Sequence, residues 1–404
     1  MWACLEAIYK NRIMTKQKPG LNTICTHVGE VADKQFKGAI SPIYMSTSYA
    51  YEDVDVKRYP RYFNTPNQEM LGKKIAALEG TEAGMVFGSG MAAVSTALLA
   101  FLNAGDHIVL QKTLYGGTFN LVEEEFSKMG IEYTFTDGLQ KADFEKAIQP
   151  NTKVVYIETP SNPLMTVTDM KMVSELAKSK GIVSMIDNTF ASPVNQNPAE
   201  FGIDVIIHSA TKYMGGHSDI LAGAVAASAA HMEQIWHKAK NLGGSLSDFT
   251  VWMLERSLKT LVLRVKQQNK NAKKLAKWLN QNTHIKAVYY PGLKSHPDYA
   301  LAKSQMSGFG GMLSFELADE LDAEAFLKEL KLIKPSMSLA GVESTILSPA
   351  QTSHALLSAE ERAHQGIADG LLRFSVGIED KADLIADLEQ ALEKVVKDSL
   401  NFSL

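Results

Sequence analysis

The chain has 404 residues, of which 45% are hydrophobic and 21% are charged; this balance is typical of a soluble globular protein and excludes intrinsic disorder. Its 41 lysines and arginines nearly balance its 45 aspartates and glutamates, so the net charge is −4. Nucleic acids and anionic membranes both require a basic face, and we expect neither as a partner. With only two cysteines, we predict no disulfide framework, no metal site and a reducing, cytoplasmic location.

No segment contains the roughly 20 consecutive apolar residues that cross a bilayer. The longest candidate, residues 90–102, is shorter and includes Ser95 and Thr96. Residues 1–14 lack the apolar stretch of a secretory signal, because charged residues interrupt them. We therefore expect no membrane association and no secretion.

Residues 1–66 are predicted to form an N-terminal extended arm. Tyrosines and prolines stand among polar residues there with little periodicity: Pro42, Tyr44, Tyr49, Tyr51, Tyr59 and Tyr62. Such a segment cannot bury a continuous face of its own.

Residues 67–260 are predicted to form a large α/β domain. Short apolar runs typical of strands occupy residues 83–87, 107–110, 133–136, 153–157, 183–186, 205–208 and 222–226. Stretches with helical periodicity lie between several of them, at residues 92–102, 119–129, 143–148 and 170–179. This alternation indicates a mostly parallel sheet with flanking helices, in which ligands bind at the carboxyl ends of the strands.

Residues 261–404 are predicted to form a smaller C-terminal α+β domain. A long amphipathic helix is expected over residues 261–280, and strands over residues 286–290, 311–316 and 372–376. The lysines of that helix are interpreted as a solvated face, because they surround an apolar stripe.

Three segments carry residues suited to chemistry. The strand at 205–208 is followed by Ser209, Thr211 and Lys212; hydroxyls donate to phosphate oxygens, and a lysine amine forms a Schiff base with an aldehyde. Asp187 ends another apolar strand, where it would either cap a helix or pair with a buried cation such as a protonated pyridine nitrogen. Gly90 and Met91 begin a small-residue helix after a strand, a place that favours a phosphate. Taken alone, each segment also fits an ordinary turn or cap.

Together, these segments resemble the Cys/Met-metabolism family of pyridoxal-phosphate enzymes. The resemblance extends in order from about residue 22 to the end of the chain, and it includes GSGMAA at 88–93, LYGGTF at 114–119, ETPSNP at 158–163, IDNTF at 186–190, HSATKYMGGHSD at 208–219, SLAGVES at 338–344 and LLRFSVGIED at 371–380. It implies pyridoxal 5'-phosphate as cofactor and an aspartate aminotransferase-like fold of the pyridoxal-phosphate transferase type.

The resemblance also assigns roles by position. Lys212 is expected to form the Schiff base and then move protons, and Tyr115 to stack on the cofactor and assist proton transfer. Asp187 would hold the pyridine nitrogen, and Asn162 would lie near the phenolic oxygen. Gly90, Met91, Ser209 and Thr211 would form the phosphate seat, completed by Tyr59 and Arg61 of a neighbouring subunit in a homodimer or homotetramer. Ser338 and Arg373 would bind the α-carboxylate of the substrate, since an arginine can bind a carboxylate through two parallel hydrogen bonds.

The activity expected from the resemblance is α,γ-elimination from a sulfur amino acid, as in cystathionine γ-lyase or methionine γ-lyase. Two alternatives stay open: γ-replacement, as in cystathionine γ-synthase or O-acylhomoserine sulfhydrylase, and an inactive cofactor-binding scaffold. Lys212, Asp187, Tyr115 and Arg373 are all present, which argues against a scaffold. Met337, where γ-enzymes of cystathionine often carry glutamate, favours an apolar substrate tail, whereas Gly117 replaces a cysteine typical of methionine γ-lyases. These departures leave the preferred substrate open.

Overall fold

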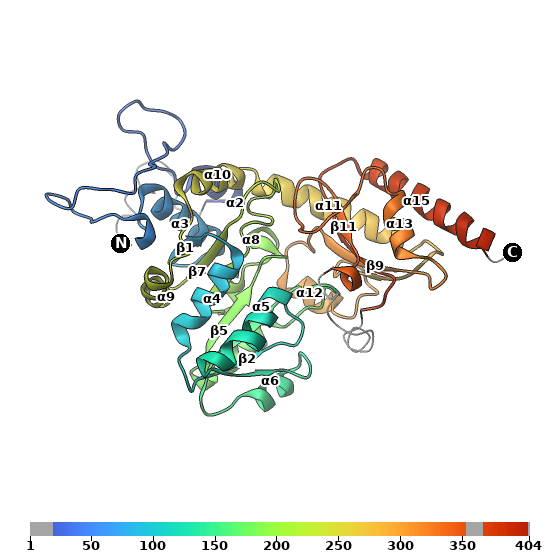
Figure 1. Ribbon diagram of the computed structural model, residues 1–404, viewed down its shortest axis with the longest axis horizontal. Helices are drawn as coiled ribbons and strands as arrows, with labels where there is room; N and C mark the ends of the chain where they lie inside the picture. The colour runs from blue at the N-terminus through green and yellow to red at the C-terminus, as the bar shows by residue number, and fades with distance from the viewer. Residues whose placement is uncertain (1–18, 353–366, 403–404) are drawn as a thin grey trace.

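The protein contains a large and a small β-sheet joined by a long helix, as seen in its computed structural model (Figure 1). The structure describes residues 19–352 and 367–402. Residues 1–18 lie outside the described residues. They include the stretch 1–14, for which no secretory signal is expected, and the beginning of the predicted arm.

The large sheet has seven strands in the order β1-β7-β6-β5-β4-β2-β3. Their bounds are β1 Ala83–Phe87, β2 His107–Leu110, β3 Glu132–Phe135, β4 Thr152–Glu158, β5 Val183–Asp187, β6 Val205–His208 and β7 Gly223–Ala227. β7 pairs antiparallel with both of its neighbours, while the remaining pairs are parallel. The prediction of a mostly parallel sheet with flanking helices is confirmed, and every predicted strand of this sheet is present.

Helices cover the two faces of this sheet, and each face has its own apolar core. The helices of this region are α3 Pro66–Glu79, α4 Gly90–Phe101, α5 Gly116–Asn120, α6 Lys141–Ala147, α7 Met170–Lys180, α8 Ser192–Asn195, α9 Ala229–Leu242 and α10 Asp248–Leu258. Because both faces are covered, the strands read as continuous apolar runs, and this is why their pattern was recognisable in the sequence.

The structure differs from the predicted helices in two respects. The single helix expected over residues 119–129 is instead α5, a π-helical segment at Leu121–Phe126 and a 3-10 turn at Ser127–Met129. α3, α8, α9 and α10 were not predicted. α3 has a clear local signal nonetheless, because Thr65 and Gln68 form a reciprocal capping box around Pro66 at its first turn.

The arm residues that the structure describes lie mostly in irregular chain, drawn as the blue loops that project from the body in Figure 1. The prediction of a purely extended arm did not include two short elements, the helix α2 Leu21–His27 and the 3-10 turn η1 Pro60–Tyr62. α2 buries Ile24 and Cys25 in the core beside α3, so this part of the arm is fixed by apolar packing. The domain boundaries at 66 and 260 stay predictions.

The small sheet has the order β10-β11-β12-β9-β8. Its strands are β8 Ile285–Tyr289, β9 Met312–Leu317, β10 Lys334–Pro335, β11 Thr345–Leu347 and β12 Leu371–Ser375, and its helices are α12 Tyr299–Gln305, α13 Ala323–Glu329 and α15 Lys381–Phe402. The long helix predicted at 261–280 is α11 Leu261–Leu279. It contributes apolar residues to the cores of both sheets and so links them.

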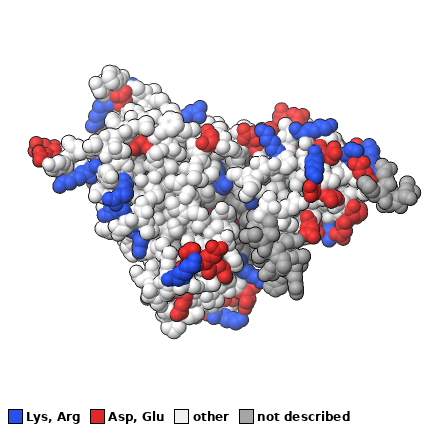
Figure 2. All heavy atoms as spheres, in the orientation of Figure 1, with Lys and Arg blue, Asp and Glu red and all other residues white. Residues whose placement is uncertain are grey.

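On the face shown in Figure 2, lysines and arginines are interspersed with aspartates and glutamates, and much of the centre carries no charge. No continuous basic area is seen on that face. Among the described residues, no helix is long and apolar enough to span a membrane.

We predict that Gly84→Ala destabilises the protein. A methyl group at position 84 would collide with the carbonyl oxygen of Gly72 in α3 and lie 2.9 Å from the amide nitrogen of Ala76, so helix and strand would have to separate. Overpacking of this kind costs about 1–3 kcal/mol. The unfolding midpoint in urea should fall. Gly20→Ala, whose added methyl meets nothing within 4 Å, should leave it unchanged; equal midpoints for both variants would contradict the prediction.

Candidate active site

Several of the predicted site residues lie at or just after the carboxyl ends of the parallel strands. Glu158 and Asp187 end β4 and β5, and they are directly paired in the register of these strands. β6 ends at His208, immediately before Ser209 and the loop to Lys212. Strands that run in the same direction deliver their ends to one edge of the sheet, so residues far apart in sequence meet there.

Lys212 lies in the loop after β6, and its Nζ donates to Ser338 Oγ at 3.0 Å. Burial, and secondarily the charge of Arg373, lower the pKa of Lys212. A lowered pKa leaves more of the amine neutral, and the neutral amine is the form that attacks a carbonyl. The surroundings of Lys212 therefore favour the neutral amine that Schiff-base formation requires.

Asp187 is almost fully buried, and its Oδ1 accepts a hydrogen bond from the backbone N–H of Thr189 at 2.9 Å. Burial raises the pKa of Asp187, while the hydrogen bonds of Thr189 oppose that rise. No lysine or arginine within residues 19–352 and 367–402 forms an ion pair with it. Of the neighbouring groups, the charge of His208 also lowers this pKa. A buried carboxylate without a paired lysine or arginine gains stability from a positive group brought beside it.

The predicted phosphate seat is formed where α4 meets the loop after β6. A side chain at Gly90 would lie 2.8 Å from Ser209 Oγ, so only a glycine allows this approach. The amides of Gly90 and Met91 are at the start of α4, where no helical acceptor is available, and the Ser209 hydroxyl has no partner in the described part of the chain. Thr211 differs, because its hydroxyl already exchanges two hydrogen bonds with the backbone of Ala222. Ser209 is thus the more available hydroxyl.

Tyr115 precedes α5, and its side chain is half exposed. A methyl group at Gly117 would lie 2.5 Å from Tyr115 Cε1 and 3.1 Å from Met91 Sδ. The ring therefore covers the backbone of Gly117 beside the start of α4. A larger residue at 117, such as the cysteine considered from the sequence, would move the Tyr115 ring.

Arg373 is hydrogen-bonded to Asn162 and to Ser338, the residue that Lys212 contacts. Arg373 Nη1 donates to Asn162 Oδ1 at 3.0 Å, and Nη2 donates to the carbonyl of Ser338 at 3.1 Å. Ser338 adopts the left-handed conformation, φ 78°, which is uncommon for a residue with a side chain. Burial lowers the pKa of Arg373 to about 10, so the guanidinium stays charged at neutral pH.

Tyr59 and Arg61 are not brought into this group. Arg61 Nη1 donates to the carbonyl of Lys240 at the end of α9, and its guanidinium lies over the rings of Tyr59 and Tyr62. Tyr59 is 43% exposed. Within one chain, these two residues belong to the outer surface of the arm.

Two residues with central positions were missed as site candidates. Glu158 is buried and contacts the backbone of both Tyr115 and Asn162. The Thr189 hydroxyl accepts the Ser209 N–H at 2.8 Å and so links β5 to the phosphate seat. The signal was available in both cases, because each residue is at or just after the carboxyl end of a predicted strand.

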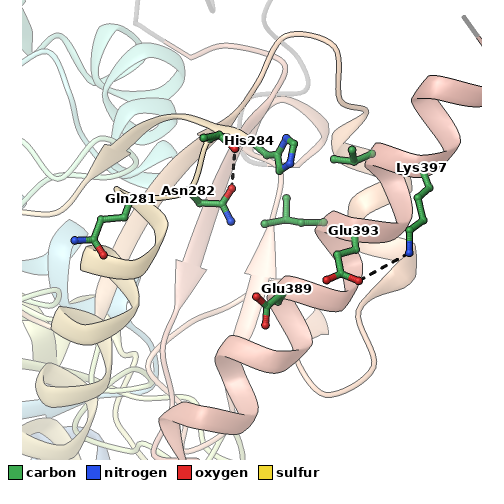
Figure 3. Close-up of a pocket in the computed structure, with 9 residues that line it drawn as sticks. Gln281, Asn282, His284, Glu389, Glu393 and Lys397 are labelled. Atoms are coloured by element: carbon green, nitrogen blue, oxygen red, sulfur yellow. Dashed lines mark hydrogen bonds and ion pairs between the residues drawn. The ribbon is translucent and has the colours of Figure 1, made fainter.

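A hollow of about 420 Å³ lies in the smaller domain between the segment that follows α11 and the helix α15 (Figure 3). His284, Glu389 and Glu393 are among its lining residues, and Glu393 is paired with Lys397. None of the predicted site residues lines it. It is separate from the candidate active site.

The fold and the site define a pyridoxal-phosphate enzyme, and comparison with known proteins agrees. Residues 22–393 match the family described as Cys/Met metabolism PLP-dependent enzyme. The chain is 42% identical to a cystathionine gamma-lyase of Bacillus subtilis (92% of this chain, 99% of the relative) and 42% identical to a cystathionine beta-lyase of Lactococcus lactis subsp. cremoris (93% and 99%). The crystal structure of cystathionine gamma-lyase from Lactobacillus plantarum has a TM-score of 0.89 at 38% identity, covering 93% of this chain and 99% of that one. The chain therefore belongs to the Cys/Met-metabolism family of pyridoxal-phosphate-dependent enzymes.

The described residues fit this cofactor. Asp187 is a buried carboxylate without an ion-paired lysine or arginine in the described chain, Ser209 offers a free hydroxyl beside the amides of α4, and Lys212 has a lowered pKa. These features match a cationic ring nitrogen, a phosphate and an aldehyde, in that order. The individual roles of these residues stay predictions.

We expect the purified protein to be yellow, and borohydride reduction to attach the cofactor to the peptide that contains Lys212. The reason is that a reduced Schiff base becomes a stable amine at the lysine that formed it. Peptide mass spectrometry identifies the modified residue. Lys180→Ala, at the exposed end of α7, serves as the control and should be modified as the wild type. A Lys212→Ala variant that still carries a reducible adduct would refute the assignment.

Proposed function

We propose that this chain is a carbon–sulfur lyase that acts on a small sulfur amino acid by α,γ-elimination. The observation that carries the proposal is the arrangement around Ser338: Lys212 binds its hydroxyl at 3.0 Å, while Arg373 binds its carbonyl at 3.1 Å. A lysine able to move protons and an arginine able to bind an α-carboxylate thus contact the same residue. This arrangement suits an α-amino acid substrate.

Each residue of the site has a distinct role in this proposal. Arg373 binds the α-carboxylate, and Asn162 orients the guanidinium through its Oδ1. Lys212 moves protons between substrate carbons, helped by the hydroxyl of Tyr115, a half-exposed residue. Bound pyridoxal phosphate supplies the carbonyl that takes the substrate amine and the electron sink for the Cα carbanion. Water completes the reaction, so that cystathionine yields cysteine, 2-oxobutyrate and ammonia.

β-Elimination is a second candidate, because one relative at 42% identity is named a cystathionine beta-lyase.

Met337 is 69% exposed directly before Ser338. An uncharged side chain at that place offers no ion pair to a distal amino group, which favours substrates with an apolar tail. γ-Replacement uses the same residues and is separated from elimination only by the fate of the substrate.

The reaction is tested by supplying one substrate at a time. Methionine, cystathionine, cysteine and homocysteine are each incubated with the holoenzyme, and O-acetyl- or O-succinylhomoserine is offered with a thiol. We expect 2-oxobutyrate and ammonia from a γ-substrate, measured by coupled reduction and by chromatography.

Lys212→Ala is the control and should give neither product. Pyruvate from cystathionine without 2-oxobutyrate would replace the proposal by β-elimination, and strong thioether formation without elimination would replace it by γ-replacement.

We propose in addition that two chains share each site, with Tyr59 and Arg61 of one chain completing the phosphate seat of the other. Three observations support this. Both residues lie on the arm surface, where Arg61 binds the carbonyl of Lys240 and no predicted site residue. The phosphate seat within one chain has no arginine among its described contacts. The arm also exposes large apolar side chains, including Phe36, Ile40, Met45, Tyr51 and Val54. Apolar groups in such number gain stability when a second copy covers them. We infer a homodimer, paired further into a homotetramer.

Mixing two inactive variants tests the shared site. Arg61→Ala removes the arm contribution and Lys212→Ala removes the Schiff-base lysine, so a hybrid dimer contains one intact site of two. Random exchange makes half of the dimers hybrid, and activity should return to roughly a quarter of the wild-type value. A hybrid of wild type with Lys212→Ala, isolated with two affinity tags, is the control. An inactive Arg61→Ala/Lys212→Ala hybrid would place Arg61 in its own chain's site.

A further inference from the structure

Glu158 is a buried carboxylate to which no role has been given. It is the last residue of β4, it is only 4% exposed, and it is paired in register with Asp187 on β5. Residues in register on neighbouring strands point to the same face of a sheet. Glu158 therefore lies on the side of the sheet that Asp187 presents to the candidate site.

Both oxygens of this carboxylate hold the backbone of site loops. Oε2 accepts the N–H of Tyr115 at 2.7 Å, and Oε1 accepts the N–H of Asn162 at 3.2 Å. The strand end is itself fixed, since Gln111 Nε2 donates to the carbonyl of Glu158 at 2.7 Å. One side chain thus determines where the loop after β2 and the loop after β4 lie relative to each other.

The hydrogen bonds continue from Asn162 to the rest of the site. Its Oδ1 accepts from Arg373, Arg373 donates to the Ser338 carbonyl, and the Ser338 hydroxyl accepts from Lys212. Tyr115 joins the same network through its N–H, which donates to Glu158. Glu158 is the link between the predicted cofactor-stacking ring and the predicted carboxylate-binding arginine.

We propose that Glu158 is a positioning residue that fixes the separation of Tyr115 and Arg373 through the two backbone N–H groups it accepts. This inference rests on the proposed function, because it takes Tyr115 to face the cofactor and Arg373 to bind the substrate carboxylate. It goes beyond that function because Glu158 is proposed to contact neither the cofactor nor the substrate. Its loss is nevertheless expected to weaken the binding of both.

The hydrogen bonds of Glu158 and the nearby Arg373 favour its ionised form, whereas burial and Asp187 favour its neutral form. Burial, and then the neighbouring Asp187, raise the pKa of Glu158 to about 8, while the two N–H donors and Arg373 act in the opposite direction. Ionised, the carboxylate offers an acceptor oxygen to each N–H. A side chain that has lost the charge holds the two loops less firmly.

Glu158→Gln tests the proposal, since glutamine keeps the size of the side chain but has one acceptor oxygen for two N–H donors. One buried donor is then left unpaired. We expect apoprotein titrated with pyridoxal 5'-phosphate to show an apparent Kd raised about tenfold or more, as an unsatisfied buried hydrogen-bonding group produces. Glycine, which has an amine and a carboxylate but no leaving group, is then added to the holoprotein, and the half-saturating concentration of its spectral change should rise by a similar factor.

Asp387→Asn is the matched control. Asp387 is equally buried and accepts the backbone N–H groups of Lys331, Leu332 and Ile333, far from the site in the smaller domain. It should lower the unfolding midpoint and leave both binding constants unchanged. If Glu158→Gln does not fold, Glu158→Asp, which keeps the charge but not the reach, replaces it and should show the same two losses.

The proposal is overturned if the Glu158 variant binds pyridoxal phosphate and glycine within twofold of the wild type, or if Asp387→Asn produces the same losses. Neither measurement requires the release of a thiol. A protein that binds both ligands but cleaves no sulfur amino acid would therefore refute the proposed function while the role of Glu158 is still decided by the binding data.

Discussion

Two buried carboxylates side by side constrain the whole site. Asp187 and Glu158 end adjacent parallel strands in register, in a place where burial favours their neutral forms. Negative charge there is tolerated only where donors surround it, and the structure supplies the N–H groups of Thr189, Tyr115 and Asn162 together with Arg373 nearby. The loops that carry the site are held in place by that requirement.

Burial acts on the two cationic side chains of the site in the opposite direction, because it lowers the pKa of a base and raises that of a carboxylic acid. Burial lowers the pKa of both Lys212 and Arg373, and Arg373 lowers that of Lys212 further. The guanidinium remains charged at neutral pH, while the amine is moved toward its neutral form. One site can thus contain a fixed positive charge for a carboxylate and a lysine able to give and take protons.

Much of the fold could be predicted because the large sheet is buried on both faces. Its strands appear as continuous apolar runs, and all seven of them were predicted. The short and partly polar elements were harder. α3 was missed although Thr65, Pro66 and Gln68 give its start a local signal, and the segment after Tyr115 changes helix type twice, which no apolar periodicity reports.

The sequence by itself determined the alternation of strands and helices and the cofactor family, since these depend on local apolar patterns and on motifs that follow one another along the chain. Through the family resemblance it also predicted Lys212, Asp187 and Arg373 as site residues. Only the tertiary structure decided that Glu158 joins Tyr115 to Asn162 and that the Thr211 hydroxyl is hydrogen-bonded to the backbone of Ala222. It also decided that Arg61 binds the carbonyl of Lys240 in its own chain. Contacts of that kind join strand ends and loops far apart in the chain, and their geometry is set by how the sheet brings its carboxyl ends together.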